Sequence, residues 1–263
     1  MSGTIRIERD GPIGWLIVDH PERRNALNAD MWRCIPGLCA ELDADPSVRV
    51  LILRGAGDRA FVAGADISEF STLRVGVDAE RYDADNVQAF AALAGLQKPL
   101  IALIHGFCIG GGVALSICAD LRYAAEDAVF ALPAGRLGLG YPVAGAQTLV
   151  GVLGQAHAKE LFLTGRKFTA AEALRLGLVN EVLPKAELET YVRALALSIA
   201  ENAPLTLTAF KLAAATMNGP TCAPDAAAVA RAKAAMQSCF ESADYREGVR
   251  AFLDKRTPHF QGR

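Results

Sequence analysis

The chain has 263 residues, 52% of them hydrophobic and 21% charged, so it can bury a sizeable core, which argues against intrinsic disorder. Its formal net charge is −2 and it has no long run of lysine or arginine, which argues against nucleic acid as a partner. The six cysteines form no C-x-x-C pair and the four histidines are isolated, so we expect no metal site and a reduced, cytoplasmic protein.

The first two-thirds of the chain predicts strands that alternate with helices. Short runs of bulky apolar residues predict the strands, and Asn28 predicts the cap of a helix that ends at Asp45-Pro46. The elements expected in chain order are strands at Ile5–Arg9 and Trp15–Asp19, the helix after Asn28, a strand at Val48–Leu53, a loop at Gly55–Gly64, a mobile segment at residues 71–80, a helix at Tyr82–Leu96, and strands at Leu100–Ile104 and Leu121–Ala124. This alternation favours an α/β fold of repeated ββα units.

After about residue 145 the pattern becomes helical. The expected helices are Ala156–Leu163, Ala170–Leu176, Lys185–Glu201, Leu205–Met217, Ala226–Phe240 and Ala243–Asp254. We therefore expect a core at residues 1–200 and a C-terminal helical region at residues 201–263 that makes subunit contacts.

The stretch from Pro99 to Ala119 has no formal charge and approaches the length of a membrane span. Three consecutive glycines, His105 and the flanking Lys98 and Asp120 fit a buried strand, turn and helix better. We therefore expect no membrane segment here.

The three glycines, Gly110–Gly112, stand between a predicted strand and a predicted helix at Val113–Ala119. Backbone N–H groups at the start of a helix are unpaired and carry partial positive charge, which favours an anionic oxygen. Glycines at such a place can equally serve close packing of the helix on the strand. A P-loop is excluded because no GKS or GKT follows, and the spacing does not match GxGxxG.

Several segments together resemble one family. Pro21–Asn28 (PERRNALN) is similar to its P-x-x-x-N-A-L-N pattern, and Phe61–Ile67 (FVAGADI) is similar to its F-x-A-G-A-D-I pattern. The segment from Lys98 through the glycine triplet to Asp120 resembles its K-P-x-I-A, G-G-G and C-D elements, and later segments extend the match in the same order. By these motifs the chain resembles the crotonase, or enoyl-CoA hydratase/isomerase, superfamily over nearly its whole length.

The resemblance implies a crotonase-like spiral core of ββα units with a C-terminal helical region. It also implies an acyl-CoA substrate, with no cofactor beyond the coenzyme A that the substrate carries, and a homotrimer or a dimer of trimers. The backbone N–H groups of Ala65 and Gly111 would form the oxyanion hole for the thioester carbonyl. The residues implied to bind substrate are Arg23, Arg24, Ala26, Ala63, Asp66, Ile67, Gly110, Pro133, Arg136, Phe252 and Lys255. Arg24 and Lys255 could equally be ordinary exposed charges.

The chain departs from the family at two positions. Enoyl-CoA hydratases of the family carry two glutamates that position water and move protons, and the matching positions here are Ala114 and Ala134. An acid–base pair cannot act where neither carboxylate exists. Hydration would need another proton carrier, for which Glu160, Glu69 and Asp66 are possible carboxylates.

Tyr141 suggests an alternative reaction. The segment Arg136–Pro142 resembles methylmalonyl-CoA decarboxylases of the same superfamily, which carry a tyrosine at this position but a histidine at the position of Ala65. Loss of carbon dioxide itself generates the enolate, so the reaction needs no strong base, and a phenol could orient the carboxylate or deliver a proton. Tyr141 could equally be an aromatic wall of the pocket.

Three hypotheses of function follow: an enoyl-CoA hydratase/isomerase-type enzyme, a decarboxylase of a malonyl-CoA-type thioester, and a silent coenzyme A-binding protein. We expect His105 to be a hydrogen-bonded core residue, and Cys108 lacks the basic neighbour that a nucleophile needs. The pattern gives neither the acyl-chain length nor the pathway.

Overall fold

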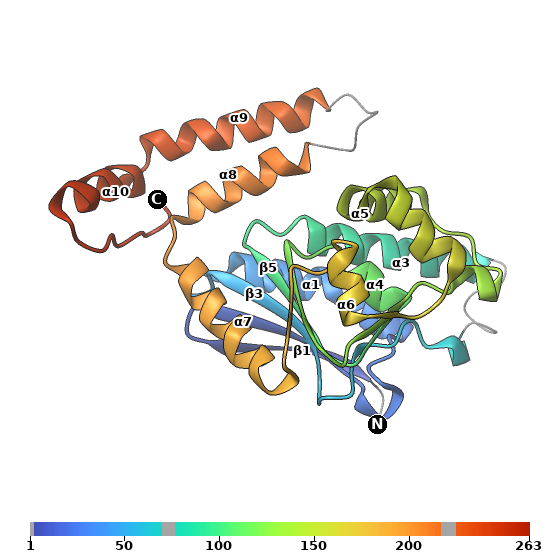
Figure 1. Ribbon diagram of the computed structural model, residues 1–263. Coiled ribbons are helices and arrows are strands. Elements are labelled where there is room, and N and C mark those ends of the chain that lie inside the picture. The colour runs from blue at the N-terminus through green and yellow to red at the C-terminus, as the bar shows by residue number, and fades with distance from the viewer. Residues whose placement is uncertain (1–2, 70–76, 217–224) are drawn as a thin grey trace.

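The computed structural model describes residues 3–69, 77–216 and 225–263. Figure 1 shows a body in which helices cover sheets, and three C-terminal helices that extend away from this body.

The larger sheet has six strands in the order β1-β2-β3-β5-β7-β10. Its strands are β1 (Thr4–Asp10), β2 (Ile13–Asp19), β3 (Val50–Gly55), β5 (Leu100–Ile104), β7 (Leu121–Ala125) and β10 (Glu181–Leu183). β1 and β2 form an antiparallel hairpin, and every other neighbouring pair is parallel. The five strands that the apolar runs predict all lie in this sheet.

A second sheet of four short strands has the order β4-β6-β8-β9. Its strands are β4 (Ala60–Val62), β6 (Phe107–Ile109), β8 (Val129–Ala131) and β9 (Phe168–Thr169). The prediction of a plain loop at Gly55–Gly64 was wrong, because β4 lies within it and pairs with β6. A strand of the larger sheet is followed by one of the smaller sheet and then by a helix, as in β3-β4-α3 and β5-β6-α4. The predicted α/β fold of ββα units is confirmed.

Each predicted helix is found, although α3 and α5 begin earlier than predicted, α4 is shifted from the predicted Val113–Ala119, and the three short 3-10 helices were not predicted. They are η1 (Pro21–Arg23), α1 (Ala29–Ala44), η2 (Ile67–Glu69), α3 (Val77–Ala94), α4 (Gly111–Ser116), η3 (Ala134–Leu137), α5 (Val143–Thr164), α6 (Ala170–Arg175), α7 (Lys185–Ala200), α8 (Pro204–Ala215), α9 (Ala226–Glu241) and α10 (Ala243–Asp254). Asn28 caps α1 as predicted, by accepting a hydrogen bond from the Met31 N–H. α5 begins well before the predicted Ala156 and is interrupted at Gly154, whose φ is 70°. Of the segment predicted to be mobile, residues 77–80 start α3 and the others lie outside the described residues.

The larger sheet buries apolar side chains on both faces, as parallel strands between helices do. Alternate residues point to opposite faces, so Ile52 and Leu103 pack with the side of α7 that carries Val192. Their chain neighbours Leu53 and Ala102 belong to the main core instead, together with α1 and α3.

The stretch considered above as a possible membrane span forms β5, β6 and α4. In the part of the chain that the structure describes, no helix combines the length and apolarity that a membrane crossing needs.

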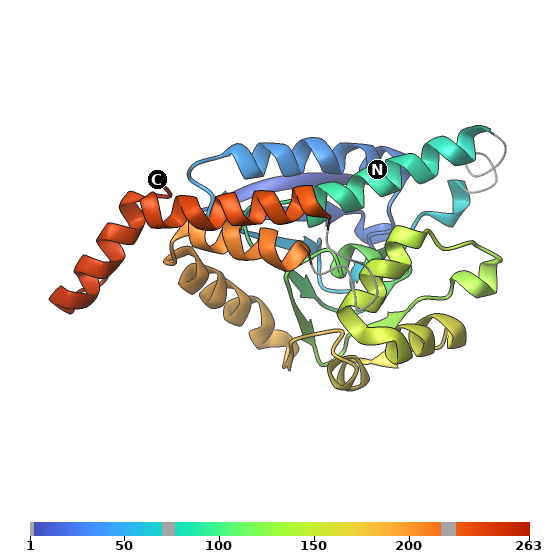
Figure 2. The same ribbon diagram turned by 90° about the horizontal axis from the view of Figure 1, so that it is seen from above.

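We call α8, α9 and α10 the C-terminal arm; Figure 2 shows it lying across the top of the body and extending beyond it. One contact between the arm and the body is made by Lys211 of α8. Its Nζ donates hydrogen bonds to the Asp120 carboxylate at 2.6 Å and to the Lys98 carbonyl at 2.8 Å. The last residues of the chain return to the start of α10, where the buried Asp244 carboxylate accepts hydrogen bonds from the Gln261 and Gly262 N–H groups.

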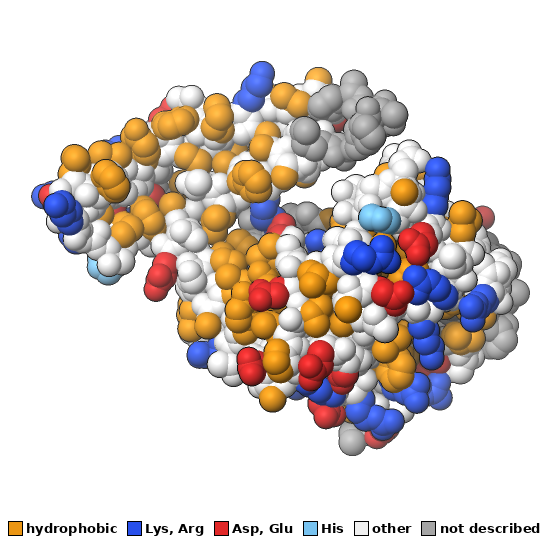
Figure 3. Space-filling view, viewed as in Figure 1, with side chains coloured by type: hydrophobic (Ala, Val, Ile, Leu, Met, Phe, Trp, Pro, Cys, Tyr) orange, Lys and Arg blue, Asp and Glu red, His pale blue; other side chains and the backbone are white. Residues whose placement is uncertain are grey.

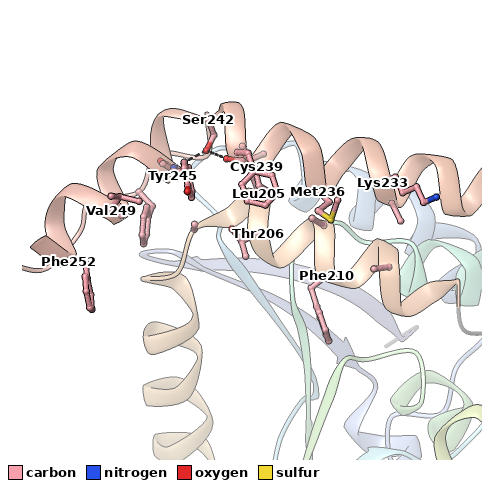
Figure 4. A pocket seen from close by; sticks show the side chains of 18 of the residues that line it. Leu205, Thr206, Phe210, Lys233, Met236, Cys239, Ser242, Tyr245, Val249 and Phe252 are labelled. Carbon is pink, nitrogen blue, oxygen red and sulfur yellow. Dashed lines mark hydrogen bonds between the residues drawn. The ribbon is translucent and has the colours of Figure 1, made fainter.

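Much of the arm's surface is apolar (Figure 3). A groove of about 890 Å³ runs along it, between residues of α8, α9 and α10. In Figure 4, Phe210 of α8 and Phe252 of α10 project to the same side, and their side chains are 73% and 83% exposed. The arm therefore presents an apolar face that the described part of this chain does not cover. The boundary between residues 200 and 201 stays a prediction.

Asn25 joins the first ββα segment to the start of β4. Its side chain is 1% exposed; the amide oxygen accepts from the His20 N–H, and the amide nitrogen donates to the Ala56 and Ala60 carbonyls. Its φ of 58° lies in the left-handed region, which asparagine tolerates better than most residues. One side chain therefore satisfies three backbone groups and fixes the chain that enters β4.

We predict that Asn25→Ala lowers the free energy of unfolding by about 3 kcal/mol, because it leaves buried backbone groups without partners. Asn28→Ala is the matched control, since it removes the cap of α1 and one long hydrogen bond to the Gly3 carbonyl, at 3.4 Å, and costs about 1 kcal/mol. Urea denaturation of both variants measures the difference. Equal losses for the two variants would contradict the structural role given to Asn25.

Candidate active site

The backbone N–H groups of Ala65 and Gly111 lie side by side. Ala65 follows β4, and Gly111 is the first residue of α4. A Cβ built on Gly111 would be 3.6 Å from the Ala65 nitrogen, and one built on Gly64 would be 3.9 Å from the Gly111 nitrogen. The flanking Leu27 and Asp66 N–H groups bond across to the Gly64 and Leu27 carbonyls, whereas the Ala65 and Gly111 N–H groups have no acceptor within residues 3–69, 77–216 and 225–263.

A cavity of about 340 Å³ opens beside these two N–H groups. It lies between α1, α3, α4, η3 and the start of α5, and apolar side chains make up most of its wall. Ala114 and Ala134, at the positions where the family carries glutamates, both line it. The residues predicted from the sequence that line this cavity are Ala63, Ala65, Ile67, Gly110, Gly111, Pro133 and Tyr141.

Few ionisable groups reach the cavity. Of the described residues that line it, those with ionisable side chains are Tyr82, Asp83, Cys118 and Tyr141. Asp83 carries the single carboxylate in this described set, and its side chain is exposed. An acid–base reaction in the cavity would therefore depend on a small set of groups.

Tyr141 lies in the cavity wall immediately before α5. Its ring packs on Phe162 with centroids 5.1 Å apart, and it covers Gly145, where a Cβ would meet the ring at 3.0 Å. Burial raises the pKa of Tyr141 to about 12. Burial also raises the pKa of Cys118 to about 12, and its thiol donates to the Ala114 carbonyl at 3.2 Å. Both groups are thus protonated at neutral pH, so Tyr141 can donate a hydrogen bond or a proton but cannot act as a resting base.

The three carboxylates considered as substitutes for the missing glutamates bond elsewhere. Glu69 accepts from the Ala29 N–H at the start of α1, and Glu160 pairs with Arg166 at 3.2 Å. Burial of Asp66 opposes its ionisation, but hydrogen bonds from Ser68 and the charge of Arg23 outweigh burial and lower its pKa. None of the three lines the described cavity.

The residues expected along the coenzyme A path fall into two groups. Arg23 and Asp66 form a pair at 2.8 Å, and the Arg24 guanidinium lies 4.8 Å from the centre of the Phe107 ring. The carbonyl of Ala26 lies 3.0 Å from Nδ1 of His20. Asp66 follows Ala65 directly, and Arg23, Arg24 and Ala26 lie on the segment that pairs with it through the bridge between Leu27 and Ala65, but none of the four lines the cavity.

Arg136, Phe252 and Lys255 are not brought to the cavity within one chain. Arg136 is exposed on η3 with Nε directed to Gly165, where a Cβ would lie 3.5 Å away. Phe252 and Lys255 belong to the end of α10, which Figure 1 places at the opposite end of the molecule from α3 and α5. A role for these two at the cavity would need a neighbouring subunit.

The opposite wall of the cavity was not predicted. It is formed by Trp32 of α1 and by one face of α3, and the α3 residues involved are Tyr82, Asp83, Asn86, Val87, Phe90, Ala91 and Ala94. Helical spacing in this segment predicts the helix and one apolar face, but it does not say which other element that face meets.

Two other residues considered from the sequence lie behind the site. His105 is buried in the core as predicted, but its Nε2 has no hydrogen-bond partner among the described residues, so the predicted hydrogen bond is not found at that atom. Burial, together with the positive charges of Arg54 and Lys185, lowers the pKa of His105 to about 4. Burial raises the pKa of Cys108 well above its usual value, which leaves its thiol a poor nucleophile. No group of three or more potential metal ligands occurs within the described ranges.

The model of the family described as "Enoyl-CoA hydratase/isomerase" matches residues 8–263. The short-chain-enoyl-CoA hydratase of Clostridium acetobutylicum is 35% identical over 96% of this chain and 95% of its own length. The crotonyl-CoA hydratase of Syntrophomonas wolfei subsp. wolfei is 36% identical over 98% of this chain and 97% of its own. Among solved structures, an enoyl-CoA hydratase/carnithine racemase from Magnetospirillum magneticum superposes with a TM-score of 0.90 at 35% identity, covering 98% of this chain and 96% of that chain.

His105 generates a prediction for stability against pH. Its imidazole titrates at 6.5 in the ordinary state and at about 4 in the folded protein, so between these values the unfolded chain binds a proton that the folded chain does not. The contribution to stability is fully present above pH 6.5 and is lost as the pH falls toward 4. From pH 7 to pH 5 we expect the free energy of unfolding to fall by about 2 kcal/mol through this group.

His105→Gln should flatten the pH dependence in that range, and urea denaturation at pH 7, 6 and 5 measures it. The same slope in wild type and His105→Gln would contradict the assignment to His105.

Proposed function

Because the chain belongs to the enoyl-CoA hydratase/isomerase family, we propose that it is an enzyme that binds an acyl-CoA thioester and stabilises the enolate made from its carbonyl. The observation that carries this proposal is the pair of unengaged N–H groups of Ala65 and Gly111 at the edge of an apolar cavity. The thioester carbonyl oxygen would accept from both N–H groups while the acyl chain fills the cavity.

Such a pair acts mainly on the transition state. As an enolate forms, negative charge develops on the carbonyl oxygen, and fixed N–H dipoles stabilise it without reorganising. The low polarity of the cavity strengthens this interaction, since an apolar wall screens charge less than bulk water does. The same two donors would serve hydration, isomerisation or decarboxylation, since each of these reactions passes through charge on that oxygen.

The proton carrier differs from the usual glutamate pair. With alanine at 114 and 134, we propose that Asp83 exchanges protons with water at the rim of the cavity, because it is the one carboxylate of the described lining. In hydration, water would lose a proton to the Asp83 carboxylate as its oxygen bonds to the β-carbon, and a proton would then be returned to the α-carbon. Tyr141, which stays protonated, would serve as a donor.

Decarboxylation of a malonyl-CoA-type thioester is a second candidate, and Tyr141 favours it. The protonated phenol could hold the substrate carboxylate while the carbon–carbon bond breaks, the electron pair passing into the enolate and carbon dioxide leaving. A final proton on the α-carbon completes that reaction. A silent coenzyme A-binding protein is the third possibility, in which the N–H pair binds but nothing turns over.

We propose that the coenzyme A part of the substrate lies along the segments of Arg23 and Arg24, outside the cavity, and that no cofactor beyond it is needed. The apolar face of the C-terminal arm supports a homotrimer or a dimer of trimers, in which Phe252 and Lys255 reach a neighbouring subunit's nucleotide. The free thiols of Cys34 and Cys39 are consistent with a reducing compartment such as the cytoplasm.

Gly111→Pro tests the N–H pair. Proline is tolerated at the first position of a helix and removes one donor, so we expect turnover of a coenzyme A thioester to fall about a hundredfold or more. Gly111→Ala is the matched control: it keeps the N–H and adds a Cβ that would meet Cζ2 of Trp32 at 3.3 Å. If Gly111→Pro is folded and as active as Gly111→Ala, the N–H pair is not the oxyanion site.

The reaction itself is tested with crotonyl-CoA and malonyl-CoA. We expect purified wild type to consume crotonyl-CoA, measured by the loss of enoyl-thioester absorbance, and Asp83→Asn to slow this at least about a hundredfold, the usual worth of a proton carrier. Carbon dioxide from malonyl-CoA without hydration of crotonyl-CoA would establish the second candidate instead. If both thioesters bind but neither is consumed, the protein is the silent binder.

A further inference from the structure

The Gly111 N–H group belongs to a segment that has little conformational restraint of its own. Gly110 has φ 54° and ψ −111°, a conformation that glycine adopts readily and other residues do not. Glycine also loses more conformational freedom on folding than any other residue, so the peptide between Gly110 and Gly111 needs support from its surroundings. The direction of the Gly111 N–H group depends on that support.

Two supports come from the main chain. The Gly110 N–H donates to the Ala131 carbonyl at 2.8 Å, and the Gly110 carbonyl accepts from the Ala114 N–H at 3.1 Å. The second bond restrains the plane that also contains the Gly111 N–H, because the carbonyl and the N–H of one peptide are coplanar. Both bonds act on Gly110, so the Cα of Gly111 has to be held by packing.

The indole of Trp32 fills the place where a side chain on residue 111 would pack. The atoms nearest to an ideal Cβ on Gly111 are Cζ2 and Cη2 of Trp32, at 3.3 and 3.4 Å, and then the Ala65 nitrogen at 3.6 Å. The edge of the indole and the Ala65 nitrogen therefore meet on the same side of Gly111. Trp32 is 2% exposed, so other atoms surround the ring that makes this contact.

Trp32 also joins α4 to the opposite wall of the cavity. Its ring packs edge-to-face on Phe90 of α3, with centroids 5.3 Å apart and planes at 72°. The helices α1, α3 and α4, which carry Trp32, Phe90 and Gly111, lie close together in Figure 1. The indole N–H has no hydrogen-bond partner among the described residues, so packing rather than hydrogen bonding holds the ring there.

We propose that Trp32 is a positioning residue that holds the Gly111 N–H group beside that of Ala65, so that both can donate to one oxygen atom. Trp32 acts through Gly111 and transfers no proton. A displacement of a catalytic group by about 1 Å can slow a reaction about a hundredfold, so a contact that fixes one donor matters to the rate. This inference rests on the proposed oxyanion site and names the side chain that keeps its two donors aligned.

The first test measures the position of the peptide without any substrate. Trp32→Phe removes the ring edge that carries Cζ2 and Cη2, and hydrogen exchange of the Ala114 amide reports on the bond to the Gly110 carbonyl. In the ligand-free full chain, measured by NMR relative to the β5 amides of the same sample, we expect this exchange to be about tenfold faster in Trp32→Phe. Trp15→Phe is the matched control, because it makes the same change at a buried tryptophan in the separate core cluster beside α7, and it should leave the exchange within about twofold of wild type.

Unchanged Ala114 exchange in Trp32→Phe overturns the inference, whichever reaction the protein catalyses. If Trp32→Phe does not fold, Phe90→Leu decides. This variant leaves Trp32 in place and removes the ring that packs on it, so the Ala114 amide should exchange about threefold faster. Exchange at the wild-type rate in Phe90→Leu then overturns the inference.

The second test follows turnover of crotonyl-CoA. We expect Trp32→Phe to lower kcat about tenfold and to change KM less than about threefold, since a misplaced donor weakens stabilisation of the transition state more than binding. Gly111→Ala presses its methyl group against the indole and should lower kcat about threefold in wild type. In Trp32→Phe the same methyl group takes the vacated place, so there it should raise kcat about threefold.

This reversal distinguishes positioning from a general loss of stability, which would make the two substitutions reduce the rate independently. Wild-type kcat in Trp32→Phe, or effects of the two substitutions that multiply, would overturn the inference and leave the proposed function intact. If wild type consumes neither crotonyl-CoA nor malonyl-CoA, the proposed function fails, and the Ala114 exchange alone decides whether Trp32 holds Gly111.

Discussion

The site depends on a close contact between two main-chain segments, the one that contains β4 and the one that contains β6 and α4. At Gly112 a Cβ would lie 2.2 Å from the Val62 carbonyl oxygen, and at Gly106 it would lie 2.0 Å from that of Arg59. Both distances are far below any real contact, so only glycine permits this approach. The contact brings Ala65 beside Gly111, and the smaller sheet, the N–H pair and one side of the cavity follow from it.

The site combines a preserved backbone with altered side chains. Backbone N–H groups are set by the glycine contact and by Asn25, so they persist whatever side chains surround them. The wall carries alanine at 114 and 134, and with Tyr141 and Cys118 both protonated it is almost without charge. Backbone groups thus stabilise the charge and side chains transfer the protons, so the proton-transferring groups can change while the site still stabilises the charge.

The sequence predicts elements best where one short pattern decides them. The strand Leu100–Ile104 is found with its predicted bounds and Asn28 caps its helix, because buried strands and caps have local signals. The strands β4, β6 and β8 were not predicted, because a strand of three residues is too short to show an alternating pattern. The first half of α5 was not predicted, because it contains several glycines, which are unfavourable in a helix. In the site, motifs located Ala65 and Gly111, but the wall formed by α3 follows from long-range packing that no local pattern encodes.

The described residues of α5 that line the cavity all precede its break at Gly154. Before the break, Ala144, Gly145 and Thr148 face the cavity while Leu149 and Leu153 are buried in the main core; after it, Ala158 and Leu161 are buried in the same core. The cavity residues of α5 are not the ones buried in the core, and the contacts of Ala158 and Leu161 lie beyond the break, so substitutions at Ala144, Gly145 or Thr148 can reshape the cavity wall and leave these core contacts in place. The protein can therefore drift toward new substrates during evolution at little cost in stability, and this part of α5 is a natural place to begin engineering its specificity.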